Sequence, residues 1–184
     1  MSSRISRAQA GSTGQMIRAV HFAAFVALAV LVTANAAVPK AKAPKEPLPP
    51  PTHADVKYGP HERHVLDLWL AKSEQPTPLV VFIHGGGFVG GDKSRARPDA
   101  LKRCLEAGVS FMAVNYRFRQ HAPIQEILRD PARAVQFVRF YAAKYNIDAA
   151  RIACYGASAG AGASLWLAVH DDLADPRSPD PVLR

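Results

Sequence analysis

The sequence is poor in cysteine, with only Cys104 and Cys154 among its 184 residues. The local patterns predict Cys104 on a helix and Cys154 inside a buried strand. Neither their spacing nor their neighbours indicate a metal site, and we interpret both as small buried apolar residues. No metal ion and no organic cofactor is therefore expected.

The sequence also lacks acidic residues before Glu46, and it contains no Lys/Arg run interleaved with aromatic residues. The formal net charge is +8 and the pI is 9.8. Arg4, Arg7 and Arg18 contribute to this charge from the N-terminal segment, and the remaining basic residues are spread along the chain. This distribution is typical of a mildly basic solvated surface, and we expect no nucleic acid partner.

No apolar run is long enough for a comfortable membrane span. The longest, from about Phe22 to Val32, follows Arg18 and precedes Ala34-Asn35-Ala36. A charged start, a short apolar centre and an A-x-A site predict a signal peptide over 1–36. We expect export to the periplasm or the medium, with no stable membrane span after cleavage; an uncleaved N-terminal anchor is the alternative.

The segment 37–51, which includes "VPKAKAPKEPLPPP", is rich in Pro and Lys and predicts an extended linker without a core. The remainder, 52–184, has the length of about one domain. Its strands are expected where apolar residues run continuously or alternate, at 64–70, 79–84, 109–116 and 151–156. The first of these alternates with polar residues and predicts a half-buried strand, whereas the other three predict buried parallel strands.

Helices are expected between these strands, at 98–108, 130–146 and 158–170. Asp130 is predicted to be an N-cap with Pro131 at the first helical position, and Asn146 is predicted to close that helix in a left-handed conformation. Alternation of strands and helices predicts an α/β fold with a mostly parallel sheet and helices on both faces.

The last predicted strand runs directly into "GASAG", Gly156 to Gly160. G-x-S-x-G between a strand and a helix is the context of a nucleophile elbow, which would expose Ser158 at the carboxyl end of the sheet. The turn must be tight, because side chains two before and two after the serine would collide with the neighbouring strand and helix. Glycine at 156 and 160 meets that requirement.

A second glycine cluster, "HGGG" at 84–87, ends an earlier strand. An acyl-transfer nucleophile generates an oxyanion that requires backbone N–H donors, and loss of one donor costs on the order of 10²–10³ in rate. We predict donors at Gly86, Gly87 and Ala159, with Gly85 letting the loop turn. Two such motifs on separate strand ends argue against a glycine-rich turn that only packs.

These residues resemble the serine esterases and lipases of the α/β-hydrolase fold, in the hormone-sensitive-lipase type or the bacterial feruloyl/acetyl esterase group. The resemblance covers about 55–169 and rests on four stretches of sequence, "PLVVFIHGGGFVGGDKS", "VNYR", "DPARAVQFVR" and "IACYGASAGAGASL". It implies that His84 orders the oxyanion loop rather than acting as a base. Ala157 and Ala161 depart from the residues that are common in the family.

A base and an acid for Ser158 are not evident. His170 lies twelve residues along the same helix, which corresponds to about 18 Å of axial rise. His121 follows a strand end, but it fits no pattern for the base. Asp171, Asp172, Asp175 and Asp180 lie at or beyond the end of that helix.

We therefore expect the N-terminal portion of a hydrolase, in which the resemblance places further strands, the acid and the histidine beyond Arg184. In that case 151–155 forms a bare sheet edge, and the chain is expected to be marginal or aggregation-prone with little or no turnover. The preferred function is hydrolysis of carboxylic esters, small or linked to polysaccharide, through an acyl-enzyme on Ser158. A peptidase or amidase and a hydrolase-like binding module remain alternatives.

Overall fold

The computed structural model describes residues 47–170, 174 and 176–183. The predicted signal peptide and the first part of the predicted linker, 37–46, lie outside the described residues. In the described part of the linker, 47–51, no helix or strand occurs.

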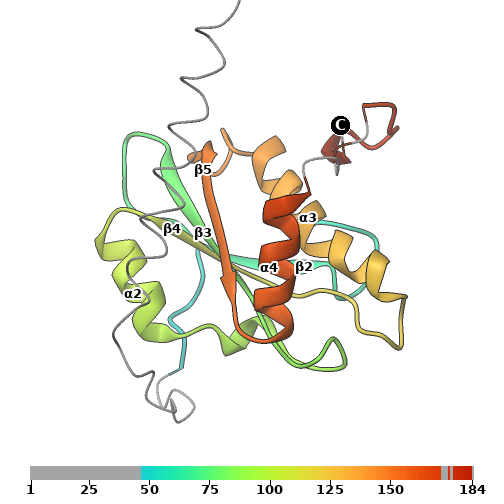
Figure 1. Cartoon of the computed structure of the whole chain (residues 1–184). Coiled ribbons are helices and arrows are strands. Elements are labelled where there is room, and N and C mark those ends of the chain that lie inside the picture. The colour runs from blue at the N-terminus through green and yellow to red at the C-terminus, as the bar shows by residue number, and fades with distance from the viewer. Residues whose placement is uncertain (1–46, 171–173, 175, 184) are drawn as a thin grey trace, which may run out of the picture. The chain divides into compact units, whose positions relative to one another are not determined.

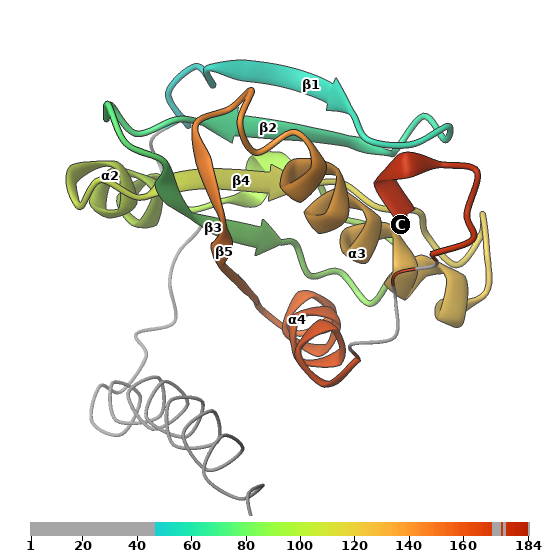
Figure 2. The ribbon, with the colours of Figure 1, turned by 90° about the horizontal axis from the view of Figure 1, so that it is seen from above.

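One five-stranded sheet organises the described chain, with the strand order β1-β2-β4-β3-β5. The strands are β1 (His53–Lys57), β2 (Val65–Trp69), β3 (Thr77–Ile83), β4 (Ser110–Val114) and β5 (Ile147–Gly156). β3 pairs in parallel with both β4 and β5, as the α/β pattern predicts, whereas β1 and β2 add two antiparallel pairings at the other edge. Figure 2 shows this order across the sheet, from β1 at one edge to β5 at the other.

Helices cover both faces of the sheet, as predicted. The helices are α2 (Pro98–Glu106), α3 (Ile124–Phe140) and α4 (Ala159–Val169), and short 3-10 turns occur at η1 (Lys93–Arg95) and η2 (Pro181–Leu183). Figure 1 shows α2 on one side of the sheet and α3 with α4 on the other. Two hydrophobic cores lie on opposite faces of the sheet, and successive residues of β3 point into different ones. Val81 packs on the α3 and α4 side and Phe82 on the α2 side.

The predicted helix at 98–108 is confirmed, with Pro98 in the first turn of α2 and Gly108 just beyond its end at φ 71°. The predicted strand at 64–70 is present as β2 but is not half-buried. β2 lies between β1 and β4, so that even Asp67 is buried and pairs with Lys93 at 2.6 Å.

The prediction of a helix at 130–146 was wrong at its start. α3 begins at Ile124, after Pro123 in the N-cap position, and it contains Pro131 in its interior. Asp130 is therefore not an N-cap. The helix ends at Phe140, and Asn146, at φ 51°, closes the turns that follow it rather than the helix itself.

β5 and α4 leave apolar surface uncovered in the described chain. β5 is an edge strand, as expected for 151–155, and its residues 149–151 and 153 are exposed. On α4, Leu165 and Val169 are 67 % and 68 % exposed. None of the described helices is both long and apolar enough to cross a membrane.

Candidate active site

The turn from β5 into α4 has the geometry of a nucleophile elbow. β5 ends at Gly156 and α4 begins at Ala159. Between them Ser158 has φ 55° and ψ −122°, a conformation that non-glycine residues rarely adopt. A strained backbone that persists in a folded protein is over-determined by its surroundings and is concentrated at functional sites. Here it leaves Ser158 exposed at the carboxyl end of the sheet.

The glycines on either side of the serine explain how this turn is held. A Cβ atom on Gly156 would lie 2.3 Å from the carbonyl oxygen of Ile83, and one on Gly160 would lie 2.0 Å from the same oxygen. Real Cβ atoms essentially never approach so closely. The predicted reason for glycine at both positions is thus confirmed, and the colliding partner is the end of β3.

The loop that follows β3 lies against the elbow. A Cβ atom on Gly85 would lie 2.6 Å from the carbonyl oxygen of Ala157 and 3.5 Å from the Cβ atom of Ser158. Gly86 and Gly87 have φ values of 125° and 61°. Gly86 also lacks room for a side chain, because its Cβ would meet the carbonyl oxygen of Gly90 at 2.1 Å. The two glycine motifs are therefore adjacent in space (Figure 1).

Backbone donors remain available where the loop meets the elbow. The carbonyl oxygen of Gly86 accepts from the N–H groups of Val89 and Gly90, which closes the turn. The N–H groups of Gly86, Gly87 and Ala159 have no hydrogen-bond acceptor within the described part of the chain. Unpaired N–H groups of this kind can bind an anion or a developing oxyanion.

His84 is fully buried beneath the loop and is arranged as a structural residue. Its ring stacks on Tyr116 at a centroid distance of 4.2 Å, and its Nδ1–H donates to the carbonyl oxygen of Gly85 at 2.9 Å. The hydroxyl of Tyr116 donates to the carbonyl oxygen of His84 at 2.6 Å. Burial lowers the pKa of His84 and favours the neutral ring, although the bond to Gly85 opposes this.

A polar network fixes the far end of the same loop, and sequence reasoning did not identify it. The amide of Asn115 bridges the loop, because its Oδ1 accepts from Lys93 N at 2.6 Å and its Nδ2 donates to Asp92 at 2.8 Å. Gly91, at φ 117°, has no room for a side chain next to His84 and Gly85. The sequence signal for this network is the pair of stretches "GGDKS" and "VNYR", because Asp92 and Lys93 of the first meet Asn115 of the second.

A second buried charge network lies behind the site. Arg117 donates from Nε and Nη2 to Asp130 at 3.0 and 2.8 Å, and Nε2 of His64 lies 3.2 Å from the same carboxylate without hydrogen-bond alignment. Burial raises the pKa of Asp130, but the contacts with His64 and Arg117 lower it by a larger amount, so the net shift is downward. This pairing explains why Asp130 lies inside α3 rather than at its end.

No described residue is paired with the Ser158 hydroxyl as a base. Its Oγ makes no hydrogen bond within the described chain. His170 follows α4, stacks on Trp166 and contacts the carbonyl oxygen of Trp166 through Nδ1. His121 accepts from the N–H of Phe118 through Nδ1 and stacks on the Phe118 ring. Both histidines are thus engaged in local contacts.

One group in the described chain has metal-binding composition, His61, Glu62 and His121, whose ligand atoms lie within 4.8 Å of one another. However, Nδ1 of His61 accepts from Arg63 N, just as that of His121 accepts from Phe118 N. Nδ1 of each ring is therefore already occupied by a backbone N–H, and Nε2 of His121 lies 3.3 Å from the side-chain amide nitrogen of Gln120. The arrangement does not fit a metal site.

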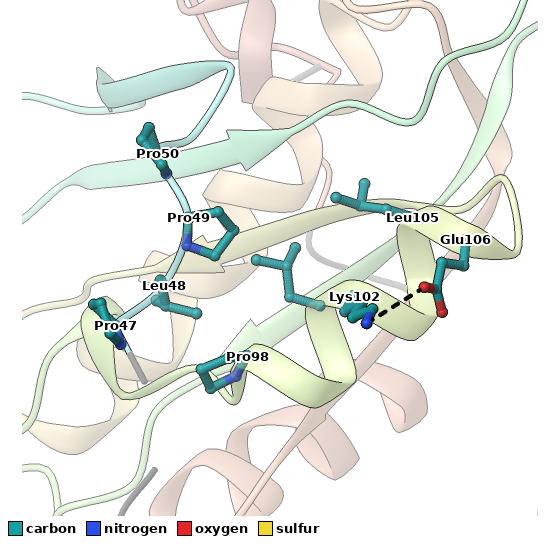
Figure 3. Close-up of a pocket in the computed structure, with 9 residues that line it drawn as sticks. Pro47, Leu48, Pro49, Pro50, Pro98, Lys102, Leu105 and Glu106 are labelled. Atoms are coloured by element: carbon teal, nitrogen blue, oxygen red, sulfur yellow. Dashed lines mark ion pairs between the residues drawn. The ribbon is translucent and has the colours of Figure 1, made fainter. Parts of the chain in front are cut away.

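Two depressions occur near opposite ends of the sheet. One, of about 770 Å³, is lined by Gly87, Phe88 and the loop 119–124. It therefore adjoins the loop that follows β3, residues 84–91, which we call the glycine loop. The other, of about 530 Å³, lies between the prolines of 47–50 and α2 (Figure 3). Its residue Leu105 is near the end of α2 that leads back to the amino end of β4, away from Ser158. Pro49 is held there by a 2.8 Å hydrogen bond from the indole of Trp69.

The comparison with known proteins matches the part of the chain that contains both glycine motifs. The BD-FAE family model matches residues 66–176. A protein of Arabidopsis thaliana named "Probable isoprenylcysteine alpha-carbonyl methylesterase ICMEL1" is 33% identical over 61% of this chain and 24% of its own length.

Two solved structures are similar at 29% and 28% sequence identity. The acetyl ester-xyloside bifunctional hydrolase of Caldicellulosiruptor lactoaceticus has a TM-score of 0.59 over 65% of this chain and 43% of its own. A truncated form of a carbohydrate esterase from gut microbiota has a TM-score of 0.58 over 67% of this chain and 45% of its own. The chain thus spans about a quarter of the curated relative and less than half of the solved ones.

Proposed function

Because this chain belongs to the BD-FAE family, whose relatives are carboxylic-ester hydrolases, we propose that it carries the nucleophile and the oxyanion hole of a serine esterase. The observation that carries the proposal is the strained elbow at Ser158, set against a loop with unpaired N–H groups. Ser158 is the nucleophile, and Gly86, Gly87 and Ala159 are the donors. His84, Gly85, Gly156 and Gly160 hold the loop and the elbow in place.

In the proposed reaction, Oγ of Ser158 forms a bond to the ester carbonyl carbon. The carbonyl oxygen becomes an oxyanion facing the donors, and the bond to the alcohol then breaks as the alcohol leaves with the proton that the Ser158 hydroxyl gave up. Water attacks the acyl-serine, releases the acid and returns a proton to Oγ. No step requires a metal ion or an organic cofactor.

The proposed substrates are carboxylic esters outside the cytoplasm, small or attached to polysaccharide. The apolar centre and A-x-A site of 1–36 support export. The acetyl ester-xyloside hydrolase and the carbohydrate esterase among the similar structures support a sugar-linked ester. A peptidase would use the same oxyanion hole, so parallel assays on ester and peptide substrates separate the two.

The test is acylation of the whole chain by 4-nitrophenyl acetate, followed by mass spectrometry of the peptides. We expect slow transfer of one acetyl group to Ser158 and little turnover, because no described residue acts as its base. The matched control is Ser164 on the same helix, whose hydroxyl donates to the carbonyl oxygen of Gly160. Ser158→Ala should abolish the modification and Ser164→Ala should retain it.

A second candidate function is a hydrolase-like binding module, favoured by the absence of a partner for the Ser158 hydroxyl among the described residues. In that case esters bind at the loop without covalent transfer. Acetylation that persists unchanged in Ser158→Ala would contradict the esterase proposal. Rapid turnover that is lost in Ser158→Ala would contradict the binding module and reveal a base within this chain.

A further inference from the structure

Three arginines near the glycine loop have no carboxylate partner within the described chain: Arg63, Arg95 and Arg119. Elsewhere in the same region arginines pair with acids, as Arg97 does with Asp99 and Arg117 with Asp130. Asp92 and Glu62 lie close enough to Arg63 to affect its charge, so the positive charge that this side adds beyond them comes from Arg95 and Arg119. A positively charged group at the mouth of a site attracts a ligand of the opposite sign.

Arg63 is held in place by carbonyl oxygens rather than by a carboxylate. Its Nε and Nη2 atoms donate to the carbonyl oxygens of Tyr116 and Gly91 at 2.8 and 3.2 Å, and its guanidinium lies 3.8 Å from the centroid of the Phe118 ring. The neighbouring carboxylate of Asp92 accepts from Ser94 and Asn115 instead. The charge of Asp92 therefore partly offsets that of Arg63 without forming a direct ion pair with it.

Arg95 and Arg119 are both exposed. Arg95 lies in η1, directly after the glycine loop. Burial lowers the pKa of His84, and the charges of Arg63 and Arg95 add to this, whereas the bond to Gly85 and the charge of Asp92 oppose it. The charges of both arginines therefore act at the site, partly offset by that of Asp92.

Arg119 is the best placed of the three to meet a bound ester. Its backbone N–H donates to the carbonyl oxygen of Phe88 at 2.8 Å, which ties its backbone to the glycine loop. It lines the depression that contains Gly87, together with the apolar residues Phe88, Ala122 and Ile124. Its guanidinium has no acceptor within the described chain.

We propose that Arg119 is a specificity-determining residue that binds an anionic group, a carboxylate in particular, on the ester substrate. This inference rests on the proposed function, since it names the class of ester that the same site takes. The carbonyl of the ester would lie at Gly87, and the carbon chain would contact Phe88 and Ala122. The carboxylate would lie at the far side of the depression, where a guanidinium can donate two parallel hydrogen bonds.

The experiment measures binding, so it does not depend on turnover. The ¹⁵N-labelled full chain is titrated at low salt with monomethyl succinate, which carries one carboxylate, and with dimethyl succinate, its neutral counterpart. Shifts of the Gly87 and Arg119 amide signals report occupancy. We expect monomethyl succinate to bind about fivefold more tightly, which corresponds to about 1 kcal/mol for an exposed ion pair.

Three variants test whether Arg119 causes the tighter binding of monomethyl succinate. Arg119→Gln should remove it, while Arg119→Lys should retain part of it, because the charge stays but the planar fork is lost. Lys72→Gln is the matched control, since Lys72 is also exposed and follows β2 at the opposite end of the sheet. It should leave the preference unchanged. Salt of about 1 M, where the screening length is about 3 Å, should abolish the preference in the wild type.

The outcomes separate this inference from the proposed function. Equal binding of both esters, or a preference that survives in Arg119→Gln, overturns the role of Arg119 and leaves the ester site standing. Failure of both esters to shift Gly87 overturns the ester site, and the inference fails with it.

Discussion

Gly160, in the first turn of α4, packs directly against the carbonyl oxygen of Ile83 at the end of β3, where a Cβ atom would lie 2.0 Å from that oxygen. This close approach positions the elbow, because it lets α4 begin immediately beside the strand that leads into the glycine loop. The backbone of β3 cannot move away without disturbing its parallel pairing with both β4 and β5.

Gly160→Ala should therefore destabilise the chain by about 1–3 kcal/mol, the range for overpacking against a fixed neighbour. Gly162→Ala is the matched control on the same helix, since its Cβ would meet nothing within 4 Å. Alanine is the better helix former, so this control should stabilise by up to about 1 kcal/mol. Urea unfolding of both variants checks the prediction, and equal stabilities would contradict the close packing.

Tyr116→Phe should weaken the support beneath the glycine loop. The Tyr116 hydroxyl donates to the buried carbonyl oxygen of His84, and burial raises the pKa of this tyrosine to about 12. Its removal leaves that carbonyl without the donor and should cost about 1–3 kcal/mol of unfolding free energy. Tyr141→Phe serves for comparison, because Tyr141 is 36% exposed and its hydroxyl has no hydrogen bond within the described chain. A loss of the same size in both variants would count against the hydrogen bond.

Asp130 should make stability depend on acid pH. Burial raises its pKa, the contacts with His64 and Arg117 lower it more, and the folded pKa lies below the value of 3.8 for a free aspartate. The carboxylate thus stabilises the fold above about pH 4, and this contribution is lost as the pH falls through the folded pKa. At neutral pH, Asp130→Asn should cost several kcal/mol, because it leaves Arg117 without its main partner.

The measurement is the unfolding free energy of the wild type and Asp130→Asn between about pH 3 and pH 7. The difference between them should narrow as the pH falls. Asp148→Asn is the control, since Asp148 pairs with Arg151 at an exposed position and should change stability little. A constant difference across the whole range would show that Asp130 has the same pKa in the folded and the unfolded chain.

The two glycine motifs could be recognised from the sequence, and their proximity inferred. Each motif is a tight turn at a strand end, and such a turn needs glycine at fixed positions. The sequence did not predict β1, whose five residues are exposed or only partly buried and whose apolar alternation is limited to Ala54 and Val56. The start of α3 was misplaced for a physical reason as well. Asp130 and Pro131 form a common helix-start pair, but here the carboxylate pairs with Arg117, a partner that only the fold brings near.

The burial of Asp67 shows the same limit. An alternating strand with an aspartate predicts one solvated face, yet Lys93 reaches Asp67 from η1 and lets both faces be covered. Burial is the largest single effect on Lys93 and lowers its pKa. The bonds to Asp67 and Asp55 together raise the pKa by more, so the net shift is upward. Such pairings join residues far apart in sequence, and no local pattern specifies them.

The uncovered surface of β5 and α4 leads to the last prediction, that the chain self-associates. An edge strand offers unpaired backbone groups to another strand, and Leu165 and Val169 add exposed apolar area beside it. The double variant Leu165→Lys/Val169→Glu adds charge to this surface without changing the net charge, so a general effect of charge is avoided. It should shift the chain toward the monomer in light scattering coupled to gel filtration.

Val89→Ser is the control, because Val89 is 63 % exposed but lies on the glycine loop, and it should leave association unchanged. The buried side of α4, at Ala159, Gly160 and Ala163, is untouched by the double variant, so its fold should persist. If the double variant associates as strongly as the wild type, the α4 face is not the contact surface. A wild type that stays monomeric at high concentration would contradict the prediction altogether, and would mean that the exposed edge is too twisted or too short to pair.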